Sequence, residues 1–382
     1  MRILKEILFW LCILTGLAWV AARLNRRKTL VLNYHGVYGG ALDPVTNFDG
    51  LHVRSDRFER QMRYLAARYR VVTPDLLLDG GPGADARGPL AGITFDDGYR
   101  NLYRYAYPVL KRLALPATVF VITDFLRFGR VLWWDRVRAM VASTRCPGVR
   151  VPIRGTERWI RLVTVAHKRA ALRLLIHELR GLPPERIEAL LARLAEDLGV
   201  GECDSETEGP LSTSQLREMA RDGISVGSHG RSHDSFLHLG RERLLAELIE
   251  SKRVLESVTG RPVHWLAYPY GQFSHEAIEM ASEAGYRSAF ACTEALNDGI
   301  PHPFAVRRIG VDDNMTFAGF IVAVSGLREF MKRLLGVARP FGVAGGAGSD
   351  PTVASPHASG RAVERRSPVG TGLDLGRDRR LP

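Results

Sequence analysis

Short apolar runs alternate with segments of helical period along the middle of the chain. The runs are rich in β-branched residues, and this alternation is typical of parallel strands joined by crossover helices. The predicted strands span residues 29–34, 70–73, 91–95, 117–122, 224–228, 264–268, 287–291 and 306–311. Seven or eight such units predict an α/β fold, an irregular (β/α)7-8 barrel that is closed or nearly closed.

Capping residues mark several of the helices between these strands. Ser55 and Asp56 precede a predicted helix over 57–69, and Ser274 begins a helix that Gly285 ends. A further helix is predicted over residues 102–114. The pattern therefore supports the order strand, helix, strand throughout this region.

The alternation is interrupted between residues 131 and 211. Helical periods over 166–180 and 185–198 occupy this stretch, with several charged residues and without strand-like runs. We expect a helical insertion that covers one mouth of the barrel.

An apolar stretch at residues 7–22 carries no charged side chain and is followed by Arg23, Arg26, Arg27 and Lys28. As a helix it would be about 24 Å long, slightly less than the ~30 Å hydrocarbon core of a bilayer. Two interpretations of residues 1–28 stay open, a retained single-pass anchor in the inner membrane and a signal segment of an exported protein. The basic residues favour the anchor but leave the side of the membrane undecided.

The other end of the chain, residues 338–382, is rich in Gly, Ala, Ser, Pro and Arg and has no apolar period, which predicts a disordered tail. The barrel domain is therefore expected over residues 29–337. Of the formal charge of +12, residues 1–28 carry +5 and the tail +3, which leaves only +4 for the barrel. With no nucleic-acid motif, this weak charge excludes nucleic acid as an expected partner.

The four cysteines, at positions 12, 146, 203 and 292, are scattered and form no C-x-x-C pair. They support neither a thiolate metal site nor a dense disulfide framework, although a pair between Cys146 and Cys203 stays open.

Polar residues collect where three of the predicted strands end. Asp96 and Asp97 follow the strand at 91–95, His229 follows 224–228 with His233 four residues later, and Tyr270 follows 264–268. The reactive groups of α/β barrels lie at the carboxyl ends of strands. Two imidazoles and one carboxylate can hold a metal ion with room for water, and a second carboxylate is then free to act as a base. The pattern predicts a metal-dependent hydrolytic site.

Three motifs, in this order on successive strand ends, resemble those of the polysaccharide deacetylases, carbohydrate esterase family four. They are TFDDG at Thr94–Gly98, H-x-x-x-H at His229 and His233, and YPYG at Tyr268–Gly271. The segments VLNYHGV, LWWDRV and FAVRRIGV are similar to one branch of that family, so that the similarity spans about Leu30 to Val311.

The resemblance implies a role for each residue of the motifs. Asp96 would be the general base, Asp97, His229 and His233 would hold a divalent metal ion, and the backbone N–H of Tyr270 would stabilise the oxyanion. Zinc is the expected metal, with cobalt or nickel as alternatives.

The implied function is removal of N-acetyl groups, by hydrolysis of a non-peptide carbon–nitrogen bond, from the amino sugars of a polysaccharide or a lipid-linked saccharide. The expected partners are therefore a glycan or glycolipid substrate and, through the N-terminal helix, a membrane. Two alternatives stay open, an O-acetyl carbohydrate esterase and a non-catalytic glycan-binding or assembly protein with the same fold.

Two roles in the family's pattern have no direct match in the sequence. Ala267 stands where the family has an arginine that orients the base, and Arg308 is our candidate substitute, with a surface or structural ion pair as its alternative interpretation. The histidine that protonates the leaving group in many members has no clear match, which leaves His264 and His302 as weak candidates.

Other residues near the predicted rim allow two interpretations. His35 follows the first strand and is expected to shape the pocket rather than to bind the metal. Trp133 and Trp134 either stack on sugar rings or pack the insertion against the barrel.

Overall fold

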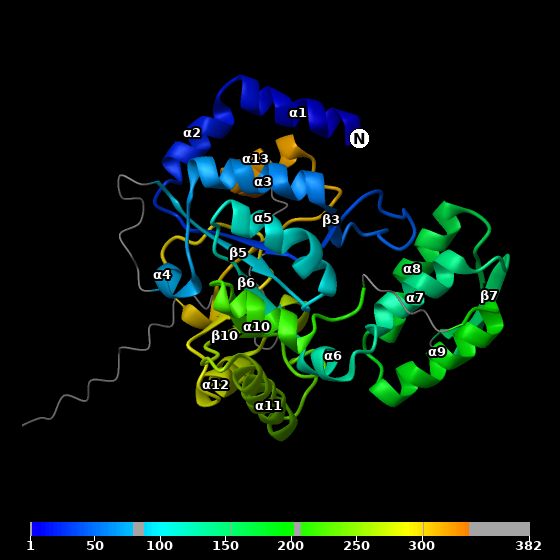
Figure 1. The fold of residues 1–382 in the computed structure, drawn as a ribbon. Coiled ribbons are helices and arrows are strands. Elements are labelled where there is room, and N and C mark those ends of the chain that lie inside the picture. Colours follow the sequence, from blue (N-terminus) through cyan, green and yellow to red (C-terminus); the bar gives the residue numbers. More distant parts are fainter. Residues whose placement is uncertain (1, 79–87, 154, 202–207, 301, 336–382) are drawn as a thin grey trace, which may run out of the picture.

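A parallel sheet of eight strands forms the centre of the molecule (Figure 1), seen in a computed structural model that describes residues 2–78, 88–153, 155–201, 208–300 and 302–335. The strand order is β11-β10-β9-β6-β5-β1-β12, and the short β4 pairs with the beginning of β5. The bounds of these strands are β1 Leu30–Tyr34, β4 Arg70–Val71, β5 Leu90–Phe95, β6 Thr118–Val121, β9 Ser225–Ser228, β10 Trp265–Ala267, β11 Ser288–Phe290 and β12 Ile309–Gly310.

The sheet curls until its two ends meet. On one side β12 pairs with β1, and on the other a parallel bridge joins Phe290 of β11 to Val306, which lies just before β12. The bridge has two backbone hydrogen bonds, from Val306 N to Ala289 O at 3.0 Å and from Ala291 N to Val306 O at 2.8 Å. The predicted α/β barrel, irregular and just closed, is confirmed.

Several strands are shorter than predicted. The runs at 264–268 and 306–311 give only the three residues of β10 and the two residues of β12. The neighbouring residues Tyr268 and Arg308 lie outside these strands and are nevertheless buried.

Helices cover the outside of this sheet (Figure 1). Their bounds are α3 Ser55–Arg68, α4 Pro74–Leu78, α5 Tyr107–Arg112, α6 Thr123–Phe128, α10 Thr213–Arg221, α11 Arg241–Thr259, α12 His275–Glu283, α13 Phe317–Val324 and α14 Leu327–Leu334. A π-helical turn, η1 (Leu102–Ala106), precedes α5, and two 3-10 turns are η2 (Pro269–Gly271) and η3 (Pro303–Ala305).

The predicted helix ends hold where a side chain caps them. Ser274 Oγ accepts a hydrogen bond from Ala277 N at 3.1 Å, and Gly285 follows α12 with φ 79°, in the left-handed region that favours glycine. α3 begins two residues earlier than predicted, at Ser55, which is inside the helix and does not cap it.

The segment from residue 131 to residue 211 contains more than helices. It holds α7 (Trp133–Ser143), α8 (Val165–Leu179), α9 (Pro184–Leu198) and an antiparallel hairpin of β7 (Gly148–Ile153) and β8 (Thr156–Arg161). Val149, Ile153 and Ile160 of the hairpin belong to a hydrophobic cluster with the three helices. We did not predict the hairpin, because charged residues separate its few apolar ones. In Figure 1 the segment forms a lobe beside the barrel.

The N-terminal stretch forms two helices and not the single helix predicted over 7–22, so that prediction is wrong. α1 (Arg2–Leu14) and α2 (Leu17–Leu24) are bent by 68° at a break that contains Gly16 with φ 78°. Phe9 and Cys12 of α1 are buried against Ala318 and Val322 of α13. Among the described residues no single helix is long and apolar enough to cross a bilayer, whereas this bent pair together meets the criteria of length and composition.

Two predictions fall on residues outside the described ranges. They are the disordered tail at 338–382 and the pairing of Cys203.

Candidate active site

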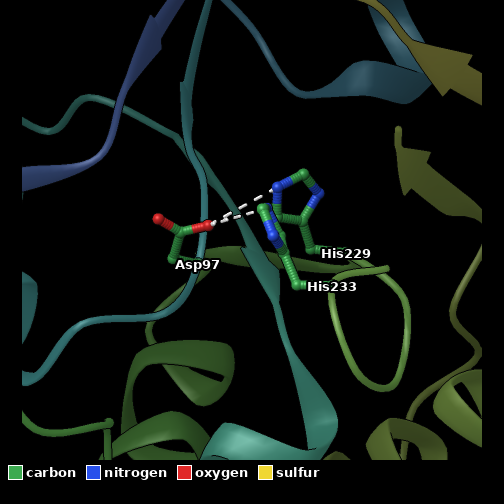
Figure 2. A group of neighbouring side chains, drawn as sticks. All are labelled: Asp97, His229 and His233. Carbon is green, nitrogen blue, oxygen red and sulfur yellow. Dashed lines mark ion pairs between the residues drawn. The ribbon is translucent and has the colours of Figure 1, made fainter. Parts of the chain in front are cut away.

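Asp97, His229 and His233 converge at the carboxyl end of the barrel (Figure 2). Asp97 Oδ1 lies 3.5 Å from His229 Nε2 and 3.6 Å from His233 Nε2. Asp97 follows β5 and His229 follows β9, and both strands pair with β6, so the sheet itself brings the two side chains together. All three residues are buried.

The backbone at this site adopts an unusual conformation. Four non-glycine residues in the described part of the chain have φ in the left-handed region, and three of them are Asp97 (72°), His233 (67°) and Tyr270 (59°). Each such residue costs roughly 1–3 kcal/mol and persists only where its surroundings hold it. Three rim loops therefore share a strained geometry that aims their side chains or amides toward one point.

Glu247 holds the loop between the two histidines. This fully buried residue of α11 accepts hydrogen bonds through Oε2 from Arg231 N at 2.8 Å and Ser232 N at 3.0 Å, and through Oε1 from Ser232 Oγ at 2.9 Å. Glu247 carries no signal in the sequence, because one glutamate in a charged helix resembles an ordinary surface residue.

The imidazole of His229 is oriented by the backbone. Its Nδ1 lies 2.8 Å from Ala267 O, a contact that requires Nδ1–H to donate and leaves the lone pair of Nε2 facing Asp97. Ala267, which stands where the family has an arginine, thus contributes its backbone carbonyl group to the site.

Asp96 is paired with Arg308, which is fully buried. Arg308 Nη1 donates to Asp96 Oδ1 at 2.7 Å and Nη2 donates to Oδ2 at 2.9 Å, while Asn33 Nδ2 donates to Oδ2 at 3.0 Å. Burial alone would raise the pKa of Asp96, but the positive charge of Arg308, which also donates two hydrogen bonds, holds this pKa well below its usual range. The surface alternative for Arg308 is therefore wrong, since the arginine lies inside the barrel and fixes a carboxylate in its ionised form.

Asp97 has the opposite environment. Burial, followed by the negative charges of Asp96 and Asp135, raises the pKa of Asp97 well above its usual value. Its Oδ1 is buried with no hydrogen-bond partner among the described residues, and the same is true of His233 Nδ1. Buried polar atoms are normally satisfied, so this cluster needs a positive charge that the described residues do not supply.

A divalent cation fits this donor set. Two ligands that each lie about 2.0–2.1 Å from a tetrahedral zinc ion are about 3.4 Å apart. The separations of 3.5 Å and 3.6 Å from the Asp97 oxygen to the two imidazole nitrogens are close to that value.

His35 and Tyr270 lie next to the cluster. Burial, modified by the charges of Asp96 and His229, lowers the pKa of His35 to about 4, so this residue belongs to the same electrostatic environment. The ring of Tyr270 meets that of His233 edge to face, with centroids 4.5 Å apart. The structure does not bring the other two histidines here. His264 precedes β10, at the end of the strand away from Tyr270, and His302 precedes η3.

Trp134 connects the 131–211 segment to the site. Its buried ring lies 4.9 Å from that of His233, and its Nε1 donates to Tyr99 Oη at 3.0 Å. Tyr99 Oη in turn donates to Asp135 Oδ2 at 2.7 Å. Of the two interpretations of Trp134, packing against the barrel is the one that the structure supports.

Comparisons with known proteins agree with this site. The family model of the polysaccharide deacetylases matches residues 83–146 and 195–289, which include both aspartates and both histidines. The curated protein described as putative polysaccharide deacetylase YxkH, from Bacillus subtilis (strain 168), is 22% identical over 307 residues, which cover 79% of this chain and 78% of that protein.

Two solved structures share the fold. The deacetylase PplD of Streptococcus pyogenes in complex with acetate has a TM-score of 0.52 and 18% identity, over 78% of this chain and 98% of that one. IcaB from Ammonifex degensii has a TM-score of 0.50 and 21% identity, over 78% of this chain and 97% of that one. In its barrel, its strand-end motifs and these matches, the chain is similar to the polysaccharide deacetylases, and the similarity includes both aspartates and both histidines of the site.

Proposed function

We propose that the chain is a metal-dependent hydrolase that removes N-acetyl groups from the amino sugars of a polysaccharide or a lipid-linked saccharide. The observation that carries this proposal is the buried Asp97 oxygen, which has no hydrogen-bond partner among the described residues and faces two imidazole nitrogens. Beside it, Asp96 is kept ionised by Arg308. Two adjacent carboxylates with opposite environments suit two different tasks.

Asp97, His229 and His233 would hold the divalent ion, and zinc suits a set of two imidazoles and one carboxylate, with cobalt or nickel as alternatives. When bound, the ion supplies a Lewis acid that polarises the acetyl carbonyl group and makes water more acidic. The tautomer of His229, fixed by Ala267 O, presents Nε2 as the ligand atom.

The remaining roles belong to the chain itself. Asp96 takes a proton from the attacking water, which it can do because its pKa is low enough to keep it ionised and because Arg308 and Asn33 hold both of its oxygens in place. The backbone N–H of Tyr270, in its left-handed turn, stabilises the oxyanion. His35 shapes the pocket beside Asp96.

Release of acetate from two substrates tests the proposal. We expect the purified full chain, loaded with zinc, to release acetate from acetylated chitooligosaccharides, to lose this activity with a chelator and to regain it with zinc. Release from O-acetylated xylan alone would favour the esterase. No release from either substrate, together with no binding of a divalent ion, would favour the non-catalytic glycan-binding protein.

We also propose that α1 and α2 associate the chain with a membrane. Both helices expose large apolar side chains in addition to the face that packs on α13, among them Ile3, Leu4, Leu14, Trp19 and Leu24. A basic cluster follows them at residues 23–28, and such a combination is typical of an amphipathic membrane contact. In a flotation assay the full chain should rise with anionic vesicles; a chain without residues 1–28 that floats equally well would contradict this.

A further inference from the structure

The last turn of α8 brings a positive charge to the mouth of the site. Arg180, the residue that follows α8, places its guanidinium carbon 4.5 Å from the centroid of the Tyr270 ring. That ring is itself in edge-to-face contact with His233. The guanidinium group is thus one aromatic ring away from a residue of the proposed metal site.

This charge has no acidic partner within the described ranges. Arg180 is exposed and makes no ion pair there, whereas three arginines of the barrel do. Arg308 binds Asp96, Arg231 binds Glu250, and Arg243 binds Asp234. Arg180 is therefore a cation at the mouth whose charge no described carboxylate neutralises.

The contact with Tyr270 leaves the hydrogen-bonding edge of Arg180 available. A cation–ring contact does not use up the N–H donors of a guanidinium group, which lie in the plane of the group and point outward. These donors match the two oxygens of a carboxylate or a phosphate group in a bidentate arrangement. Tyr270 also holds the group in position, which lowers the entropy lost when an anion binds.

A structural role for Arg180 as a latch between the 131–211 segment and the barrel is the competing explanation. The segment and the barrel already have buried contacts elsewhere, since Trp134 packs on His233. Ile176, one turn before Arg180 on α8, packs against the hydrophobic cluster that contains Trp134. An exposed cation over a ring adds only about 0.5–1 kcal/mol. The latch therefore does not account for an unpaired charge at this point.

We infer that Arg180 forms an anion subsite, which binds a carboxylate or phosphate group on the substrate next to the acetylated sugar. The inference rests on the proposed function for the identity of the substrate as an acetylated glycan. It adds that this glycan is anionic, either through a uronic acid within the chain or through a phosphate ester at its end.

Equilibrium binding tests this subsite independently of turnover. The dissociation constants of three oligosaccharides would be measured by calorimetry: a neutral chitooligosaccharide, an oligosaccharide of alternating N-acetylglucosamine and glucuronate, and a chitooligosaccharide 1-phosphate. We expect Arg180→Gln to weaken binding of one of the two anionic probes about tenfold or more and to leave the neutral probe within about twofold. Arg180→Lys should recover part of the loss, and the probe affected identifies the anion.

The matched control is Arg173→Gln, an exposed arginine two turns earlier on α8. It should leave the binding of all three probes unchanged. Equal weakening of neutral and anionic probes by Arg180→Gln would show a latch and overturn the inference, as would unchanged binding of every probe. Failure of the proposed function has a different signature, since the wild-type chain would then release no acetate from any probe whatever its affinity for them.

Discussion

The barrel and the 131–211 segment reach the same site in different ways. The barrel side is fixed by buried polar contacts, in which Arg308 binds both oxygens of Asp96 and the carbonyl group of Ala267 orients His229. The segment contributes mainly ring contacts, Trp134 on His233 and Arg180 on Tyr270, and its buried Asp135 acts at a distance on Asp97. Buried charges have exact partners and tolerate little change, whereas ring contacts at the mouth can vary.

This difference indicates that the barrel carries the proposed chemistry and the segment the proposed choice of substrate. The groups that would hold the metal and move the proton all come from strand ends, as is general for barrels of this kind. We propose that the segment, of which the family model skips residues 147–194, acts mainly on the choice of substrate. The following changes test the separation, one on each side.

The largest effect is expected from Arg308→Met, on the barrel side. It leaves the carboxylate of Asp96 buried without its partner, which costs about 3–5 kcal/mol of unfolding free energy at neutral pH, measured by urea titration. It should also reduce turnover by at least about a hundredfold, because the base loses the two hydrogen bonds from Arg308 that hold its oxygens in place.

The low pKa of Asp96 determines how stability and kcat/KM depend on pH. In the wild type the pKa of Asp96 is depressed, so the stability that this carboxylate contributes is present above the ordinary pKa of about 3.9 and is lost as pH falls through the lower folded value. In Arg308→Met the acidic limb of kcat/KM should move to higher pH. Arg307→Met, the same change at the next residue, is the control, and an unmoved limb in Arg308→Met would contradict the role of Arg308.

A smaller effect is expected from Trp134→Phe, on the segment side. Phenylalanine keeps a ring against His233 but loses the hydrogen bond from Nε1 to Tyr99 Oη. We expect turnover to fall only severalfold and metal affinity to weaken by about tenfold, as for groups that support a ligand. Zinc titration and kcat measure both. Trp133→Phe is the matched control, since Trp133 is only partly buried. A loss of turnover in Trp134→Phe as complete as in Arg308→Met would contradict the division of roles between barrel and segment.

Much of the barrel and the metal cluster could be predicted from the sequence. The apolar runs predict the strands. Asp97, His229 and His233 lie in the first residues after two of these strands, so that the local pattern already places them on one rim. The partners of these residues have no such local signal. Asn33, Glu247 and Trp134 reach the site through contacts between distant parts of the chain, and only the closed barrel shows them. The bend at Gly16 was missed because apolar composition does not reveal where a helix breaks.

The central claim is that Asp96 and Asp97, adjacent in the chain, have different tasks. The metal content of two variants, Asp96→Asn and Asp97→Asn, tests it most directly, after circular dichroism has established that both are folded. We predict that Asp96→Asn retains about one divalent ion per chain without turnover, whereas Asp97→Asn loses the ion and the activity together. An Asp96→Asn variant that loses the ion while Asp97→Asn retains it would contradict the account.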